Sequence, residues 1–246
     1  MKSFKNFYNK FHKYSAVQYK LISENNFTYQ TIIKIFNKYI KQNDTVLDIG
    51  CGVGVLSLYY GNKCKLVTGI DISNKVITLA IKSAKILYLD NSVKFKTLNF
   101  PDDYLKDTFD KIIFSEVLEH IFNESKALIA ISKMLKHDGK LIITVPSTNS
   151  PLYKMGLSKK FDEEVGHLRR YSANDLIDKL EENGFKIHKI YKTSGLIRNI
   201  MYNSKQFDLL IRLMKGYIGI FINYLDSLTI NVFGESQIIA IATKKR

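Results

Sequence analysis

The chain has 246 residues, of which 46% are hydrophobic and only three are proline, so its composition excludes long disordered stretches and fits one sizeable folded domain. Two cysteines, Cys51 and Cys64, exclude a disulfide framework and favour a reducing compartment. The net charge of +14 leaves three kinds of partner open, namely nucleic acid, an anionic membrane surface and an acidic substrate.

Two stretches of the sequence bear on location. Residues 1–10 lack the apolar core of a secretory signal, and the uncharged run Gly216–Leu225 is too short to cross a bilayer, so we expect a cytoplasmic protein. Ordinary packing into the core is the simpler interpretation of the apolar segment Ser194–Phe233. The same segment leaves peripheral membrane contact open, because it also carries the basic residues Arg198, Lys205, Arg212 and Lys215.

The first half of the chain alternates between helical and strand patterns. Apolar residues at helical spacing predict a helix over Phe27–Ile40, within an N-terminal helical cap of residues 1–44. The main domain is then predicted to span residues 45–246. Its first predicted strands are Thr45–Ile49, Leu66–Ile70, Val93–Leu98 and Phe109–Phe114, and the predicted helices among them are Val53–Tyr60, Ser73–Leu87 and Glu124–Leu135.

The second half of the chain is less regular. Residues 147–171 form a polar segment, after which Ser172 begins a helix that ends at Leu180, with Asp175 at the capping-box position. A turn is predicted at His137–Gly139, and strands are predicted over Lys140–Val145, Phe185–Thr193 and Gln237–Thr243. Because helices separate the strands, the pattern predicts a doubly wound α/β fold with a mostly parallel sheet and helices on both faces.

Residues Val46–Gly54, VLDIGCGVG, combine a strand, a tight glycine turn and the start of a helix. The glycines allow backbone conformations that other residues resist, and N–H groups at the helix start then face a ligand. Asp71 follows at the end of the second predicted strand, where a carboxylate accepts hydrogen bonds from ribose hydroxyls. The pattern therefore predicts a site for a nucleotide cofactor.

The glycine spacing distinguishes between two classes of nucleotide site. A dinucleotide-binding dehydrogenase has G-x-G-x-x-G, whereas this chain has G-x-G-x-G followed by Val55, with Asp48 inside the strand. These residues, together with Gly69–Asp71, the run Phe109–Ile121 and the run MLKHDGKLIITVPS, resemble the motifs of class I S-adenosylmethionine (SAM) dependent methyltransferases. The resemblance covers residues 40–190 and implies a seven-stranded sheet with an antiparallel last strand.

The same resemblance implies SAM as the cofactor and a place for each of its parts. Asp48 and the glycine turn lie beside the methionine part, Asp71 binds the ribose, and Ile72 lies against the adenine. Asn99 stands where the family often has an aspartate that contacts the adenine amino group. The implied cofactor-binding residues are Asp48, Gly50, Cys51, Gly52, Gly54, Asp71, Ile72, Asn99, Phe100 and Ser115.

Ionisable residues follow the fourth predicted strand at Glu116, Glu119 and His120, and His167 lies in the later segment GHLRRY. The run E-x-x-E-H resembles two metal-dependent groups, the ubiquinone-biosynthesis O-methyltransferases and the small-RNA 3′-end 2′-O-methyltransferases. The resemblance implies that these four residues are catalytic and hold Mg²⁺ or another divalent cation. A site without a metal, in which His120 acts beside the methyl group, stays open.

The neighbours of His167 have a second interpretation. Arg169 and Arg170 either bind an anionic acceptor together with His167, or belong to a solvated loop in which they pair with Glu163 and Glu164.

The leading hypothesis for function is O-methylation of a small-molecule, lipid or glycan acceptor, with residues 147–171 and 194–233 as insertions on the acceptor side. The first alternative is metal-dependent methylation of an RNA ribose 2′-hydroxyl, which the net charge and the E-x-x-E-H run favour. The second is a non-catalytic SAM-binding partner subunit, against which the intact Asp48 and Asp71 argue. The accepting atom and the oligomeric state stay open.

Overall fold

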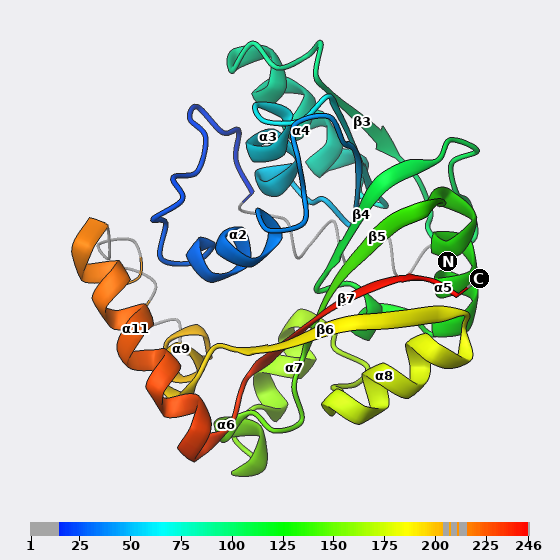
Figure 1. The fold of residues 1–246 in the computed structure, drawn as a ribbon. Coiled ribbons are helices and arrows are strands. Elements are labelled where there is room, and N and C mark those ends of the chain that lie inside the picture. The colour runs from blue at the N-terminus through cyan, green and yellow to red at the C-terminus, as the bar shows by residue number, and fades with distance from the viewer. Residues whose placement is uncertain (1–14, 204–206, 208–210, 212–215, 246) are drawn as a thin grey trace.

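The computed structural model describes residues 15–203, 207, 211 and 216–245. At its centre lies a sheet of seven strands in the order β3-β2-β1-β4-β5-β7-β6 (Figure 1). The strands are β1 Thr45–Ile49, β2 Leu66–Asp71, β3 Val93–Thr97, β4 Phe109–Ser115, β5 Leu135–Pro146, β6 Phe185–Thr193 and β7 Gln237–Lys244.

The strands from β3 to β5 pair in parallel, whereas β7 lies antiparallel between β5 and β6. The predicted mostly parallel sheet with an antiparallel last strand is therefore confirmed. The chain builds outward from β1 to β3 and then returns to place β4 on the other side of β1. Ligands of doubly wound sheets bind at such a switch point, beyond the carboxyl ends of the strands.

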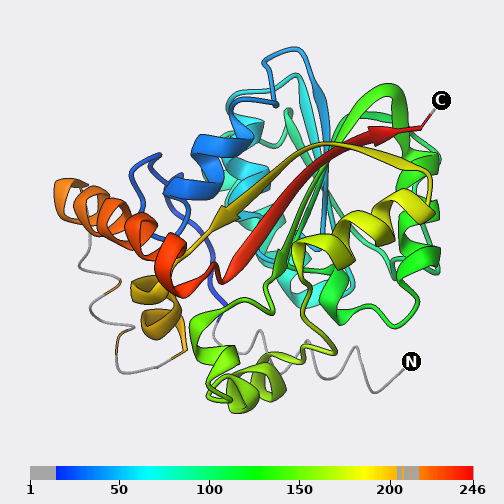
Figure 2. The ribbon, with the colours of Figure 1, turned by 60° about the horizontal axis from the view of Figure 1, so that its bottom comes forward.

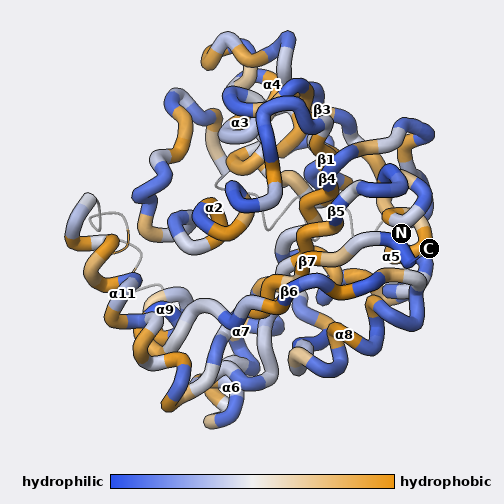
Figure 3. The backbone as a smooth tube through the Cα atoms, viewed as in Figure 1, coloured by the Kyte–Doolittle hydropathy of each residue, from blue (hydrophilic) through white to orange (hydrophobic). Residues whose placement is uncertain are grey.

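Helices cover both faces of the sheet (Figure 2). Because side chains alternate along a strand, Leu47 and Ile49 pack with α5 and α8, while Val46 packs on the opposite face with α2 and α3. Figure 3 shows long apolar stretches in β4, β5 and β7, between these helical layers. The helices of the two layers are α2 Gln30–Phe36, α3 Val55–Gly61, α4 Asn74–Ile86, α5 Glu124–Met134 and α8 Ala173–Glu182.

Side chains at the helix starts explain where two of these helices begin. The Ser172 hydroxyl accepts a hydrogen bond from the Asp175 N–H at 3.1 Å, and the Asp175 carboxylate accepts one from the Ser172 N–H at 3.0 Å. This pair is the predicted capping box of α8. At the start of α5, the Asn123 side chain accepts the N–H of Lys126. This cap marks the end of the loop that connects β4 to α5.

Two segments in the middle of the chain differ from the sequence prediction. Strand β5 begins directly after α5, and the expected turn at His137–Gly139 is a bulge within it, because Leu135 pairs with Phe109 and Lys140 already pairs with Lys111. The polar segment 147–171 is not merely a loop. It contains α6 Pro151–Lys154 and α7 Lys159–Val165.

The apolar segment Ser194–Phe233 forms α9 Leu196–Tyr202 and α11 Gly216–Phe233, and α11 lies at the margin of the molecule in Figure 1. Three of its basic residues, Lys205, Arg212 and Lys215, lie outside the described residues, as do residues 1–14 of the predicted cap. Within the described part of the chain, every helix is too short or too polar to cross a membrane.

Candidate active site

The glycine turn leaves β1 at the switch point of the sheet. Gly50, Gly52 and Gly54 all have positive φ, between 54° and 81°, which side chains disfavour. A Cβ atom at Gly50 would lie 2.4 Å from a methyl group of Val117, so the turn packs tightly against the loop after β4. A Cβ atom at Gly52 would meet nothing within 4 Å. The backbone at Gly52 is therefore open to a ligand.

Asp71, at the end of β2, is tied to the glycine turn. Its carboxylate accepts the N–H of Gly52 at 3.0 Å and the N–H of Ser73 at 2.8 Å. Asp71 lines an open cavity of about 1190 Å³ beyond the strand ends, which is large enough for a small-molecule ligand. Five further predicted cofactor-binding residues line the same cavity, namely Gly50, Gly52, Ile72, Asn99 and Phe100.

Asp48 lies in a second cavity of about 600 Å³, on the other side of the glycine turn. Its side chain is buried and accepts a hydrogen bond from the Ser57 hydroxyl at 2.6 Å. Burial raises the pKa of Asp48 to about 7. Cys51 lines this cavity as well, and burial raises the pKa of its thiol, which fits a small packing residue and not a nucleophile.

The two cavities adjoin, because Gly50, Gly52, Glu116 and His120 line both of them. Most of the predicted cofactor-binding residues are thereby gathered around one continuous space. Ser115 lines the second cavity, whereas Gly54 lines neither and instead begins α3, where a Cβ atom would lie 2.6 Å from the ring of Phe95.

Glu116 follows β4 and is held by the neighbouring strands. Its Oε1 accepts hydrogen bonds from the Thr144 hydroxyl at 2.7 Å and from the Gln237 amide at 3.1 Å. The residue has a φ of 55°, an uncommon value for a side chain other than glycine, and functional sites often hold such residues. Strands β5 and β7 therefore orient this carboxylate at the junction of the two cavities.

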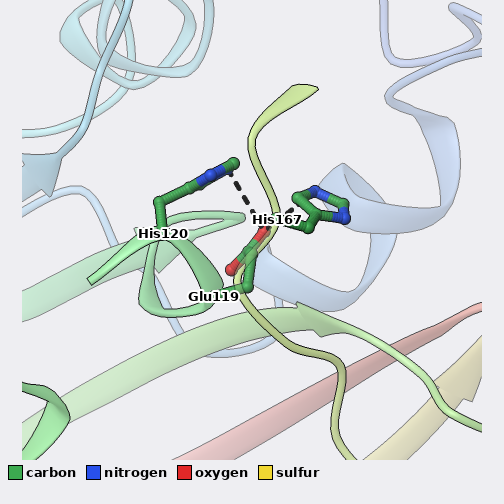
Figure 4. A group of neighbouring side chains, drawn as sticks. All are labelled: Glu119, His120 and His167. Carbon is green, nitrogen blue, oxygen red and sulfur yellow. Dashed lines mark ion pairs between the residues drawn. The ribbon is translucent and has the colours of Figure 1, made fainter. Parts of the chain in front are cut away.

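Glu119, His120 and His167 come together from a short 3₁₀ helix, Leu118–His120, and from the loop after α7 (Figure 4). Glu119 is fully buried, and neither of its carboxylate oxygens has a hydrogen-bond partner among the residues that the structure describes. Its Oε1 lies 3.8 Å from Nε2 of His120 and 3.8 Å from Nε2 of His167. Of the four predicted metal ligands, Glu116 alone stands outside this cluster within the described residues.

The opposite ring nitrogen of each histidine has its own partner. His120 Nδ1 lies 2.9 Å from the carbonyl oxygen of Gly166, and His167 Nδ1 lies 2.8 Å from a carboxylate oxygen of Asp162. Since these partners accept hydrogen bonds, each ring donates its Nδ1–H to its partner and turns its Nε2 toward Glu119. One ligand atom from each of Glu119, His120 and His167 lies within 4.8 Å of the other two, an arrangement that suits a shared cation or proton.

The electrostatics of the cluster follow from burial. Burial, with the nearby charge of Glu116, raises the pKa of Glu119 well above its ordinary range. Burial also lowers the pKa of His120 to about 4, so this imidazole is neutral at physiological pH. Burial acts to raise the pKa of Asp162, but hydrogen bonds from His167 and Arg170 outweigh it and lower that pKa.

The arginines of the GHLRRY segment pair with carboxylates other than those expected. Arg170 makes an ion pair with Asp162 at 2.6 Å, and Arg169 makes one with Glu124 at 3.0 Å. The expected partners Glu163 and Glu164 are exposed on α7. Sequence reasoning missed Asp162, which α7 turns toward His167 when Gly166 ends the helix. The spacing alone did not distinguish it from the two neighbouring acids.

Sequence analysis also did not identify a further group of residues that line the second cavity. Arg198, grouped by sequence with surface cations, is 5% exposed and lines this cavity. Tyr29, before α2, and Tyr202, at the end of α9, line it as well. Helical periodicity marked these segments as apolar elements, but it carried no signal for which of their polar residues face a cavity.

A family model described as a methyltransferase domain matches residues 20–190. An uncharacterised protein of Methanocaldococcus jannaschii is 30% identical over 75% of this chain and 85% of its own length. The mitochondrial ubiquinone-biosynthesis O-methyltransferase of Bos taurus is 27% identical over 59% of this chain. The chain matches only 42% of the length of that bovine enzyme.

The fold has close relatives among solved structures. Phosphoethanolamine N-methyltransferase 2 of Haemonchus contortus, solved in complex with S-adenosyl-L-methionine, superposes with a TM-score of 0.63 at 18% identity. The match covers 89% of this chain and 53% of that protein, and at this identity it speaks for the fold alone. The family match spans the glycine turn, Asp71 and the cluster after β4. The chain belongs to the class I SAM-dependent methyltransferases.

Proposed function

We propose that the chain transfers a methyl group from SAM to a hydroxyl oxygen of a small-molecule acceptor, and that Glu119, His120 and His167 hold a divalent cation beside that hydroxyl. The observation that carries the proposal is the fully buried Glu119 carboxylate, which faces two imidazole nitrogens and accepts no hydrogen bond within the described structure. His120 lines both cavities, so this cluster borders the space where cofactor and acceptor would meet.

The residues around the glycine turn fit SAM. The open backbone at Gly52 leaves room for close approach, and the Asp71 carboxylate has lone pairs for ribose hydroxyls. Ile72 and Asn99 would contact the adenine in the large cavity, and Asp48 would lie beside the methionine part in the second. When bound, SAM supplies a methyl group on a sulfonium, and the protein's task is to align it with the accepting oxygen.

The cluster fits a divalent cation as well. A metal-bound histidine usually donates its other N–H to a carbonyl or a carboxylate, as His120 does to Gly166 and His167 does to Asp162. Two imidazoles and one carboxylate suit Mn²⁺, Fe²⁺ or Zn²⁺ better than Mg²⁺. A cation there lowers the pKa of a nearby hydroxyl. Glu116, held by Thr144 and Gln237, would orient the acceptor from the junction of the cavities.

The relatives support a small acceptor. Those named for ubiquinone biosynthesis methylate oxygen, and another is named as a phosphoethanolamine N-methyltransferase of Arabidopsis thaliana. The RNA and partner-subunit alternatives are outcomes of the test that follows.

The test uses fractionated cell extract and SAM with a labelled methyl group, with and without a chelator. We expect label in a small-molecule fraction, loss of labelling with the chelator, and restoration by Mn²⁺ or Zn²⁺. Label in RNA would support the RNA alternative. Labelling that persists in the presence of the chelator would contradict the proposed metal site. SAM binding with no labelled fraction would favour the non-catalytic subunit.

Metal binding is measured separately by titration calorimetry with Mn²⁺ and Zn²⁺. Glu119→Gln keeps the shape of the side chain and removes its charge, so we expect it to abolish metal binding and labelling. Glu163→Gln makes the same change on the exposed face of α7 and is expected to bind metal like the wild type. Equal metal binding by both variants would contradict the assignment of Glu119.

A further inference from the structure

The second cavity has a polar wall made of residues to which the proposed function gives no role. This wall comes from α9 and from the residues just before β7, on the side away from the glycine turn. Four residues that line this cavity each have a buried side-chain atom with no hydrogen-bond partner among the described residues, namely Arg198 Nε, Tyr202 Oη, Asn203 Oδ1 and Ser236 Oγ. Buried polar groups are almost always hydrogen-bonded, so unpartnered atoms on four residues that line one cavity support a polar ligand there.

Arg198 is the centre of this wall. Its guanidinium lies between the rings of Phe27 and Tyr202, 5.2 Å from each ring centre. It donates to the carbonyl oxygen of Phe27 at 2.7 Å, to that of Thr28 at 3.0 Å and to the Asn223 side chain at 2.8 Å. These neutral contacts fix the plane of the guanidinium, and none of them supplies a negative charge.

The carboxylates near Arg198 are engaged elsewhere. Asp226 lies close by, but its oxygens accept the backbone N–H groups of Gly195 and Arg198 at the start of α9. In the same cavity, Asp48 accepts a hydrogen bond from Ser57, and Glu116 accepts hydrogen bonds from Thr144 and Gln237. Arg170, the other arginine that lines the cavity, is paired with Asp162. Within the described chain, Arg198 makes no ion pair.

We propose that Arg198 is an anion subsite for the acceptor, which is a hydroxylated acid with a carboxylate or phosphate group. This inference rests on the proposed function. One end of the acceptor presents its reacting hydroxyl near Glu119, and the other end places its anionic group on Arg198. Tyr202, Asn203 and Ser236 bind further hydroxyl groups. A neutral quinone ring with an apolar tail would leave this charge and these polar atoms without partners.

Anion binding is measured apart from catalysis, on the protein in complex with a cofactor product that cannot transfer a methyl group. The protein is saturated with S-adenosylhomocysteine (SAH), and three probes of similar size are titrated by calorimetry: D-glucuronate, D-glucose 6-phosphate and D-glucose. We expect at least one anionic sugar to bind about tenfold or more tightly than glucose, as a charge-assisted hydrogen bond would produce. Preference for glucuronate assigns a carboxylate, and preference for the phosphate ester assigns a phosphate.

Variants identify the residue responsible. Arg198→Gln is expected to lose the preference for the anionic probe, and Arg198→Lys to keep part of it, while both bind SAH within about twofold of the wild type. Asn223→Ala removes a neutral partner of the guanidinium and is expected to keep the preference. SAH binding also shows that each variant is folded.

Three results would overturn the proposal. Equal binding of glucose and both anionic sugars would contradict the anion subsite. An unchanged preference of Arg198→Gln for the anionic sugar over glucose would contradict it as well. A loss of SAH affinity of about tenfold in Arg198→Gln and Arg198→Lys would assign the charge to the carboxylate of the cofactor instead. Glu119→Gln keeps the anion preference and loses methyl transfer, so failure of the metal assignment is distinguishable from failure of this inference.

Discussion

At the residue scale, Asp71 joins the glycine turn to the end of β2, and we propose that its carboxylate also binds the cofactor ribose. Asp71→Asn retains the size of the side chain but removes its charge, so we expect SAH affinity to fall by about tenfold or more. Titration calorimetry measures the change. Asp103→Asn, an exposed residue on the same cavity, serves as the control and is expected to bind SAH normally. Equal affinity of the two variants would show that Asp71 does not contact the ribose.

Asp48 gives the ligand-free protein a characteristic dependence on pH. Burial raises its pKa to about 7, so the folded protein keeps this proton at pH values where the unfolded chain has lost it. The stabilisation is complete below the ordinary pKa near 4 and is lost as the pH rises toward 7. In Asp48→Asn this contribution is absent.

We therefore expect the Tm of the wild type to fall relative to that of Asp48→Asn as the pH rises from about 5 to about 8. The measurement is a series of thermal melts without SAM. A difference in Tm that stays constant across this range would mean that Asp48 titrates normally in the folded protein.

The sequence predicted the positions of Asp48 and Asp71 on their strands better than it predicted the packing of the cluster after β4. Asp48 and Asp71 lie within β1 and β2, and the glycine turn follows β1 directly. Predicting these two strands therefore also places these residues in the sheet. Glu119 and His167 are 48 positions apart in the sequence, and helix α7 brings them into contact. The charged residues of this segment did not predict a helix there. The burial of Glu119 and the role of Asp162 are products of that packing.

At the scale of elements, the capping box of α8 contributes to the stability of the sheet face that α8 covers. Ser172→Ala removes the hydrogen bond to the Asp175 N–H, so we expect the free energy of unfolding to fall by about 1 kcal/mol. Denaturant titration measures this loss. Ser158→Ala is the matched control, because Ser158 precedes α7 without a capping hydrogen bond and its buried hydroxyl has no partner in the described part of the chain. A loss in Ser158→Ala as large as in Ser172→Ala would contradict the cap as the cause.

Strands were predicted more accurately than the connections between them. Thr45–Ile49 and Phe185–Thr193 match the structure, because both segments are rich in the β-branched and aromatic residues that favour strands. The bulge in β5 depends on its pairing with Phe109 and Lys111, which local sequence does not encode. Helix α7 is short, and none of its residues is buried, so it lacks the apolar stripe by which a helix is recognised.

At the scale of the whole molecule, cofactor binding couples to folding, because the cavities combine the glycine turn with α9 and the segment before α2. SAH at about 100 times its Kd stabilises the folded state by about 2.7 kcal/mol. For a chain of this length we expect the Tm to rise by about 5–10 °C, as measured by scanning calorimetry. Asp71→Asn at the same SAH concentration is expected to rise less. Equal shifts would contradict a ribose contact that stabilises the fold.

The position of β7 sets an order of events during synthesis. Strand β7 lies between β5 and β6, so a nascent chain that has not reached Gln237–Lys244 leaves the facing edges of both strands unpaired. Strands β1 to β5 are already in sequence by then and pair in parallel with one another. The half of the sheet that carries the glycine turn and Asp71 can therefore assemble on the ribosome before β7 joins β6 to β5.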